Sequence, residues 1–310
     1  MRIAVFGTGG VGGYFGGRLA EAGESVAFVA RGQHLEAIRH EGLRVESIAG
    51  DFLVHPADAS DDPASLGPVD VVLVAVKAWQ VPEAALALAP LLRDDSFVIP
   101  LQNGVEAADQ LAAVVGRERV IGGLCRIVAF VSGPGRIRHA GIPPRIEFGE
   151  RDGRQTERLA RLKAAFEKAR GLTVGVPADI EAAVWEKFLF IAPVSGVGAL
   201  TRVPVGVFRA IPETRAMLEA ALREVFSLAR VRGIMLQHDA VAKTLGYLDA
   251  MPPEATASMQ RDILEGRPSE LESQTGTVVR LARAAGIPAP VNETIYRALL
   301  PLEQKARGML

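Results

Sequence analysis

The first half of the chain alternates short apolar runs with segments of helical periodicity. The apolar runs are RIAVFG, SVAFVA, VDVVLVAV and SFVIPLQNG, and helical patterns extend to Glu21 and lie near residues 33–41 and 82–92. Nearly continuous apolar strands between helices are typical of a parallel sheet covered on both faces. The pattern therefore predicts a doubly wound α/β domain.

Residues 119–150 break this alternation, because β-type runs follow one another there with only Gly and Pro turns between them. Such a segment predicts an antiparallel extension of the same sheet. A helix near residues 155–169 and the strand LTVGV then complete a domain of residues 1–178. The segment PAD, residues 177–179, is a predicted hinge, with Asp179 as the cap of the next helix.

Strand signals stop after this hinge. Helical periodicity is found near residues 180–192, 212–231, 238–250, 254–265, 269–285 and 291–308. Residues 179–310 are therefore predicted to form an all-helical second domain.

Composition limits the class of protein and of partner. The 310 residues are 49% apolar and 23% charged, which describes a globular protein of about two domains. A net charge of −1 gives no electrostatic reason to expect nucleic acid or an anionic membrane, so a small molecule is the expected partner. Cys125 and the scattered histidines lack ligand-like spacing, so we expect a buried structural thiol and no metal site.

The location of the protein is predicted from its apolar runs. The amino-terminal run is too short for a signal peptide, and no run elsewhere approaches the roughly 18 apolar residues of a membrane-spanning helix. We therefore expect a cytoplasmic protein. The helical half shows no decisive apolar patch, which leaves the choice between a monomer and a homodimer open.

The stretch FGTGGVGGYFGG places Gly7, Gly9 and Gly12 in the spacing G-x-G-x-x-G, directly after the first strand and at the start of a helix. Glycines at these positions permit a tight turn, close approach of the backbone to a pyrophosphate and close helix packing. The N–H groups of the helix amino terminus bind the anion. We expect a dinucleotide here; the alternative is a purely structural glycine turn.

The second strand ends in Arg31, with no carboxylate before Glu36. NAD sites usually place an acid here to bind the ribose 2′-hydroxyl, whereas an arginine can form paired bonds to a 2′-phosphate. The sequence therefore predicts NADPH, against the alternative of a solvated arginine. Lys77 and Asn103 follow the next two strands, at the sheet edge where ligands bind in this fold; for each the alternative is a strand cap or a turn.

Lys187 lies on the apolar stripe of a helix, with Ile180, Val184 and Ile191. Lysines in such places often extend their charge to the surface along the side-chain stem. The functional alternative follows from its position just past the hinge, where an interdomain cleft is expected to favour a ligand site. Partial desolvation there makes an ammonium group a better proton donor.

Gly266 and Pro268 interrupt a later helical segment, and Ser269 is expected to cap a new helix with Glu270 in its first turn. A first-turn glutamate is commonly just a favourable partner of the helix dipole. The functional alternative is a carboxylate that balances Lys187 or binds a substrate hydroxyl.

Five motifs occur in a set order: GxGxxG, KAWQ, QNG, WEKF and SMxxDxxxGRxxE. Together they resemble the ketopantoate reductase (2-dehydropantoate 2-reductase) family over essentially the whole chain. The resemblance implies a Rossmann-type domain with a helical domain after it. It also implies NADPH-dependent reduction of ketopantoate, a 2-oxo acid, to pantoate in pantothenate biosynthesis.

The same resemblance assigns roles to individual residues. It implies Lys187 as the catalytic acid that protonates the forming alkoxide, and Glu270 as the residue that binds and orients substrate. Asn103 lines the site for substrate and cofactor, and Ser258 lines it for substrate. On the cofactor side, Arg31 matches the phosphate-binding arginine, and Lys77 and Gln80 match residues that contact the cofactor.

The chain also departs from the family pattern. Family members typically carry asparagine four, eight and eighteen residues after the catalytic lysine, where this chain has Ile191, Ser195 and Val205. Ser195 keeps one hydroxyl for substrate, but isoleucine and valine cannot replace an amide. A site that lacks such polar partners discriminates against the substrate that needs them.

Two rival functions stay open, the first because of these departures and the second because the glycine loop and Arg31 account for binding alone. One is a reductase of this fold for a less polar 2-oxo acid, which Ile191 and Val205 would suit. The other is a non-catalytic NADPH-binding sensor, which would have no need for both Lys187 and Glu270.

Overall fold

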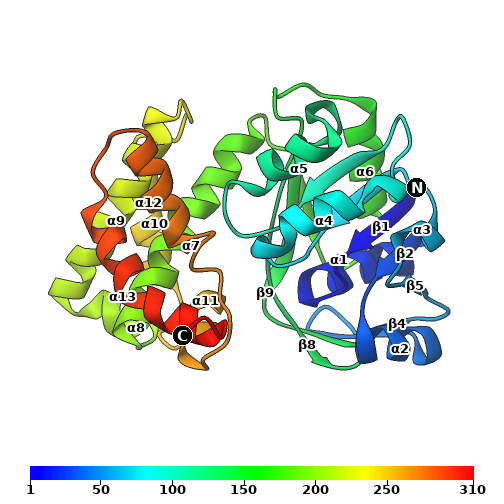
Figure 1. Ribbon diagram of the computed structural model, residues 1–310, viewed down its shortest axis with the longest axis horizontal. Coiled ribbons are helices and arrows are strands. Elements are labelled where there is room, and N and C mark those ends of the chain that lie inside the picture. The colour runs from blue at the N-terminus through cyan, green and yellow to red at the C-terminus, as the bar shows by residue number, and fades with distance from the viewer. The chain divides into compact units, whose positions relative to one another are not determined.

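The computed structural model describes residues 1–310, and the chain divides into two units (Figure 1). Unit 1 comprises Met1–Gln102 and Ala107–Ile180, and unit 2 comprises Asn103–Glu106 and Glu181–Leu310. The chain therefore passes from one unit to the other three times.

Unit 1 is an α/β unit built on two sheets. Its helices are α1 (Gly10–Glu21), α2 (Gly32–Glu41), α3 (Pro63–Leu66), α4 (Val81–Ala87), α5 (Ala107–Val115) and α6 (Glu157–Glu167), with short 3₁₀ turns η1 (Ala78–Gln80), η2 (Ala89–Leu91) and η3 (Arg117–Arg119). Its strands are β1 (Arg2–Phe6), β2 (Ser25–Val29), β3 (Leu43–Ser47), β4 (Phe52–Val54), β5 (Asp58–Ser60), β6 (Val71–Val74), β7 (Phe97–Pro100), β8 (Gly122–Gly133), β9 (Arg136–Gly149) and β10 (Thr173–Gly175).

The first sheet has the strand order β5-β2-β1-β6-β7, and all its pairs are parallel. Successive side chains of β1 enter different cores: Ile3 and Val5 join one cluster, and Ala4 and Phe6 join the other. Both faces are therefore buried, as the continuous apolar runs predicted. The predicted Rossmann-type doubly wound sheet is confirmed.

The second sheet corrects one detail of the sequence prediction. Strands β8 and β9 do pair antiparallel, but they belong to a separate sheet of order β10-β9-β3-β4, with β8 on the other side of β9. An isolated parallel bridge between Val98 and Val120 joins the start of this segment to β7. Strands β8 and β9 form a separate sheet because β9 pairs in parallel with β3, a short strand that the apolar pattern did not predict.

Helix α1 is in contact with both sheets, and its glycines make this possible. A Cβ atom on Gly12 or Gly16 would lie 2.2 Å from the Gly7 oxygen or 2.4 Å from a Val5 methyl group, on the side of the first sheet. On the other side, a Cβ on Gly13 or Gly17 would collide with side chains of the second sheet. The helix therefore has no room for larger residues at these positions.

Unit 2 is all-helical, as predicted. It contains α7 (Ile180–Thr201), α8 (Val205–Ala210), α9 (Pro212–Val231), α10 (Ala240–Ala250), α11 (Ser258–Leu264), α12 (Thr275–Ala284) and α13 (Pro290–Ala306). Helix α7 continues well beyond the expected end near residue 192 and passes through Pro193. Its later residues Val194, Val197 and Ala199 are buried, so tertiary packing holds the helix past the proline.

The sequence predicted no apolar run as long as a membrane-spanning helix, and helix α7 corrects this prediction. It is long and apolar enough to cross a membrane by length and composition alone. However, 61% of its most apolar 18-residue window is buried inside the protein, as in a core helix.

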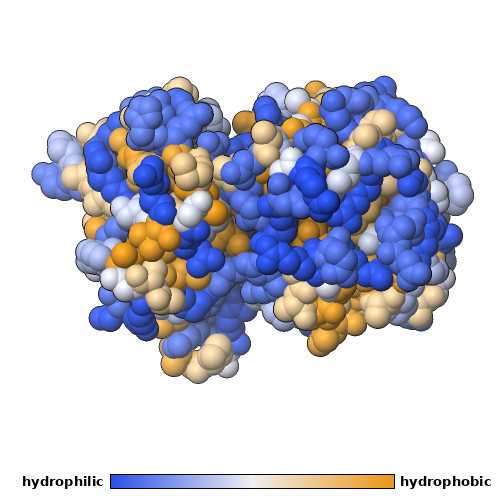
Figure 2. Space-filling model, turned by 90° about the horizontal axis from the view of Figure 1, so that it is seen from above, coloured by the Kyte–Doolittle hydropathy of each residue, from blue (hydrophilic) through white to orange (hydrophobic).

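The surface carries apolar side chains from several elements. Figure 2 shows a mainly hydrophilic face with hydrophobic residues between the polar ones. Leu86, Met235 and Leu310 are among the most exposed large apolar residues, and each comes from a different part of the chain.

Candidate functional site

Parallel strands of the first sheet end at one common edge, and predicted ligand-binding residues lie just beyond it. Gly7 follows β1, Arg31 follows β2 and Lys77 follows β6, whereas Gln102, which was not a predicted site residue, follows β7. The strand order reverses between β1 and β6, and this is the place where open α/β sheets bind their ligands.

The three glycines of the loop have different surroundings. Gly7 has a φ of +102°, and a Cβ there would lie 2.9 Å from the Val76 nitrogen, so this position needs glycine for its backbone and its packing. A Cβ on Gly12 would overlap the Gly7 oxygen. In contrast, nothing lies within 4 Å of a Cβ built on Gly9, which caps the amino terminus of α1.

The amino terminus of α1 fits a pyrophosphate. No side chain caps it, and its first turn carries no acidic residue, so its backbone N–H groups remain for an anion. The open space beside Gly9 is where a bound phosphate would approach the backbone. These residues therefore fit the predicted dinucleotide.

His34 ties the glycine loop to the β8–β9 turn. The Gly135 N–H donates to His34 Nδ1 at 3.0 Å, so Nε2 carries the proton and donates to the Thr8 oxygen at 2.8 Å. Burial lowers the pKa of His34, which favours this neutral form. This contact could not be predicted from the sequence, because His34 and Gly135 are 101 positions apart.

Of the predicted cofactor-side residues, Arg31 and Lys77 are exposed and Gln80 is half-buried. The Arg31 side chain is 65% exposed, and its Nη2 lies 3.7 Å from Glu83 Oε1, which is a weak contact between exposed charges. Lys77 and Gln80 share one tight turn, because the Lys77 N–H donates to Gln80 Oε1 at 3.2 Å. The Lys77 ammonium lies 5.7 Å from the centre of the Trp79 ring.

Glu270 is the centre of a polar cluster in unit 2. It is 6% exposed, and two neutral amides donate to the same oxygen, Oε2: Asn103 Nδ2 at 3.1 Å and Gln274 Nε2 at 3.3 Å. Its second oxygen, Oε1, accepts no hydrogen bond within the protein. The structure thus brings Glu270 and Asn103 together, and it adds Gln274, which the motif comparison did not include.

Glu270 does not lie in the first turn of a helix, which corrects the sequence prediction. Glu270 lies in a bend, residues 271–274 form turns, and α12 begins at Thr275. The Ser269 hydroxyl accepts the Leu271 N–H at 3.2 Å, but this bond caps a series of turns and not a helix, and the hydroxyl also donates to Glu303 Oε2 at 2.5 Å.

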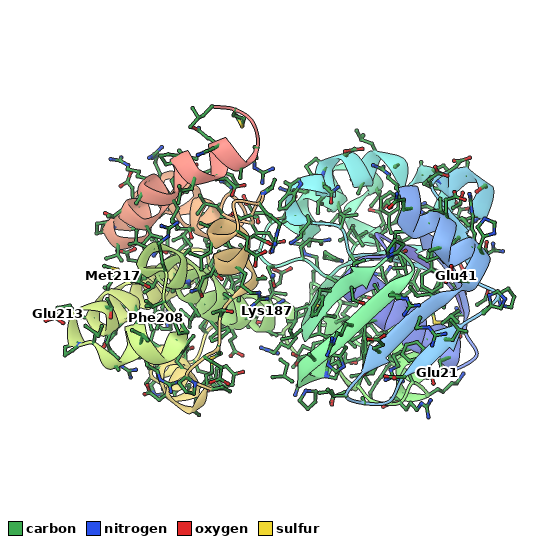
Figure 3. All side chains as sticks on the ribbon, turned by 90° about the horizontal axis from the view of Figure 1, so that it is seen from below. Glu21, Glu41, Lys187, Phe208, Glu213 and Met217 are labelled. Atoms are coloured by element: carbon green, nitrogen blue, oxygen red, sulfur yellow. The ribbon has the colours of Figure 1, made fainter.

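Lys187, labelled in Figure 3, is a half-buried residue of α7. Val184 and Ile191, on the same stripe, are also half-buried, whereas Trp185 and Phe188 are fully enclosed on the opposite side. The apolar stripe that holds Lys187 is therefore only partly buried, since Ile180 at its start is enclosed.

The remaining predicted substrate residues have different environments. Ser258 is half-buried at the first position of α11. Ser195 is fully buried, and its hydroxyl has no hydrogen-bond partner within the protein. Of the two apolar departures, Val205 lies in the core and donates its N–H to the Ala255 oxygen at 3.0 Å, whereas Ile191 is half-buried one turn beyond Lys187.

Comparison with known proteins gives matches over almost the whole chain. A family described as "Ketopantoate reductase PanE/ApbA" matches residues 3–153, and its "C terminal" counterpart matches residues 179–303. The chain is 32% identical over 299 residues to a Bacillus subtilis (strain 168) protein named "Uncharacterized oxidoreductase YkpB", covering 96% of this chain and 98% of that protein. It is 30% identical over 311 residues to a 2-dehydropantoate 2-reductase of Nostoc sp., covering 99% and 96% respectively.

A solved structure shows the same architecture. The crystal structure of a PanE/ApbA family ketopantoate reductase from Ralstonia eutropha JMP134 has a TM-score of 0.90 and 32% sequence identity with this chain. The match covers 99% of this chain and 100% of the other.

The two loop glycines should respond differently to substitution. Gly9→Ala has room in the protein but would intrude on a bound pyrophosphate, so we expect unchanged stability and dinucleotide affinity weakened by about 1–3 kcal/mol, about 5- to 150-fold in Kd. Gly12→Ala should instead lower the free energy of unfolding by about 1–3 kcal/mol. Titration calorimetry and thermal unfolding measure the two effects; equal loss of stability in both variants would contradict the assignment.

His34 should make stability depend on pH. Because its folded pKa is lowered, the unfolded chain takes up a proton first as the pH falls below about 6.5. The contribution of His34 is thus complete above that pH and is lost as the pH falls through the folded pKa. Urea unfolding at pH 7.5 and pH 5.5 should show a smaller loss for His34→Gln than for the original protein, with the exposed His40→Gln as control. An equal loss in His34→Gln and the original protein would refute this.

Proposed function

The chain belongs to the ketopantoate reductase family, and on this premise we propose that it reduces ketopantoate to pantoate with NADPH, a step of pantothenate biosynthesis. Members of this family are NAD(P)-dependent oxidoreductases that act on CH–OH groups and take a small 2-oxo acid as substrate. The observation that carries the proposal is the buried carboxylate of Glu270, which has one oxygen anchored and the other without a partner.

Glu270 is suited to bind a substrate hydroxyl. The two amides fix Oε2, so Oε1 has a set direction and is available as an acceptor. A hydrogen bond to a charged acceptor contributes about 1.5–3 kcal/mol when the geometry is good. In the proposed role, Glu270 orients the substrate and Asn103 holds Glu270.

Lys187 is the proposed proton donor. When bound, NADPH supplies the hydride to the carbonyl carbon. The Lys187 ammonium donates a hydrogen bond to the carbonyl oxygen and transfers its proton as negative charge develops there. Tyr296 is a poorer donor, because burial and its hydrogen bond to Glu272 raise the pKa of its phenol to about 12.

The residues of the sheet edge are the proposed cofactor site. The backbone beside Gly9 and the amino terminus of α1 would hold the pyrophosphate, Arg31 would bind the 2′-phosphate, and Lys77 with Gln80 would line the same edge. As part of this proposal the enzyme acts in the cytoplasm, since its long apolar helix α7 is mostly buried.

A second candidate function is reduction of a less polar 2-oxo acid. The observation that favours it is Ile191, half-buried on the Lys187 face of α7 where an amide would serve a hydroxylated substrate. The match to a relative named only as an uncharacterized oxidoreductase is compatible with either substrate.

The choice of NADPH predicts an effect of Arg31. Arg31→Ala should raise the Kd for NADPH by about 10- to 150-fold, the loss of about 1.5–3 kcal/mol of charged hydrogen bonding. The Kd for NADH should not change. Glu83→Gln is the matched control: it removes the carboxylate beside the guanidinium and should leave NADPH affinity equal or higher. Fluorescence titration with both nucleotides checks this, and an unchanged NADPH/NADH ratio in Arg31→Ala would rule the assignment out.

Turnover tests the function itself. We expect NADPH oxidation at 340 nm with ketopantoate, compared with a panel of apolar 2-oxo acids, and a fall in kcat of about 10²–10⁴ for Lys187→Ala with NADPH affinity retained. The exposed neighbour Glu186→Ala is the control. Activity only on apolar members would select the second candidate. Tight NADPH binding without turnover on any member would indicate a sensor, and full activity in Lys187→Ala would remove this residue from the mechanism.

A further inference from the structure

Glu270 lies in a segment without regular secondary structure. Helix α11 ends at Leu264 and α12 begins at Thr275, and Gly266, Arg267 and Pro268 between them are exposed. The Glu270 side chain is anchored by amides, but its backbone position depends on contacts outside both helices.

Glu303 of α13 supplies such contacts to the preceding residue. It is 2% exposed, and both of its oxygens accept from the Ser269 N–H, at 3.1 and 3.0 Å. Glu303 Oε2 also accepts the Ser269 hydroxyl at 2.5 Å. Hydrogen bonds to a buried carboxylate are shorter and stronger than those between neutral groups.

Arg307, the residue that follows the last residue of α13, completes the arrangement. Its Nε donates to Glu303 Oε1 at 2.6 Å, and its Nη2 donates to the Ser269 oxygen at 2.9 Å. The Ser269 hydroxyl in turn accepts the Leu271 N–H at 3.2 Å. Every polar group of Ser269 is therefore bound, and the residues on both sides of Glu270 are fixed.

We propose that Glu303, through Ser269, is a positioning residue that sets the direction of the unpartnered Glu270 oxygen toward substrate. The inference rests on the proposed role of Glu270. Glu303 uses both oxygens on protein groups, so it has none left for a ligand, whereas Glu270 keeps one. Supporting groups of this kind typically change activity by about 10- to 100-fold when they are altered.

The chain offers a matched control for the substitution Glu303→Gln. Glu224 of α9 also binds α13 through backbone N–H groups, but at the other end, where it accepts from Val291 at 2.8 Å and from Asn292 at 2.9 Å. Glu224→Gln should lower stability without changing catalysis. Comparison of the two variants separates positioning of Glu270 from general support of α13.

The expected result for Glu303→Gln is a fall in kcat/KM of about 10- to 100-fold, with NADPH affinity unchanged. A double-mutant cycle adds a stricter criterion: in a Glu270→Gln background, Glu303→Gln should cause little further loss, because both changes act on one group. The conservative Ser269→Thr should retain most activity, since it keeps the hydroxyl and the N–H. Wild-type kcat/KM in Glu303→Gln, or losses that add fully in the double variant, would overturn the proposal.

Hydrogen exchange of residues 266–276 tests, independently of turnover, whether Glu303 holds the segment that carries Glu270. We expect faster amide exchange in Glu303→Gln and no change in Glu224→Gln. If the unaltered protein reduces no 2-oxo acid, the proposed function fails, and this measurement alone tests the positioning. Unchanged exchange in Glu303→Gln would then refute it.

Discussion

The fold of unit 1 depends on the confinement of helix α1 between two sheets. Gly12 and Gly16 allow the helix to touch the first sheet, and Gly13 and Gly17 allow it to touch the second. A Cβ at any of these positions would meet other atoms at less than 3 Å, so one element connects both layers only because four side chains are missing. The same confinement fixes the amino terminus of α1, and with it the loop that fits a dinucleotide.

Unit 2 uses buried and half-buried carboxylates in two ways. Both oxygens of Glu303 and of Glu224 accept hydrogen bonds from backbone N–H groups and thus connect helices and turns. Glu270 differs, because its protein partners occupy a single oxygen. In the proposed function, the other oxygen of Glu270 accepts a hydrogen bond from the substrate.

Much of the fold and of the candidate site could be predicted from local patterns in the sequence. The apolar runs gave the parallel sheet, the glycine spacing gave the loop, and the ordered motifs gave the family. The misses involve contacts between distant segments. The second sheet needs β3 to pair with β9, where Ser47 lies beside His139, and the short strand alone has no distinctive pattern. The bond from Ser269 to Glu303 was missed because the two residues lie 34 positions apart in the sequence. Likewise, no motif could show that both amides bind one oxygen of Glu270.

The division of the chain has a consequence for domain exchange. Unit 2 is discontinuous, because Asn103–Glu106, between β7 and α5, belong to it. Asn103 holds Glu270, and Glu106 accepts from Thr277 and Arg280. A recombination event that joined a foreign nucleotide-binding half at residue 180 would bring its own segment in place of these four residues. The donor half would therefore have to supply residues that match the helical half at this segment.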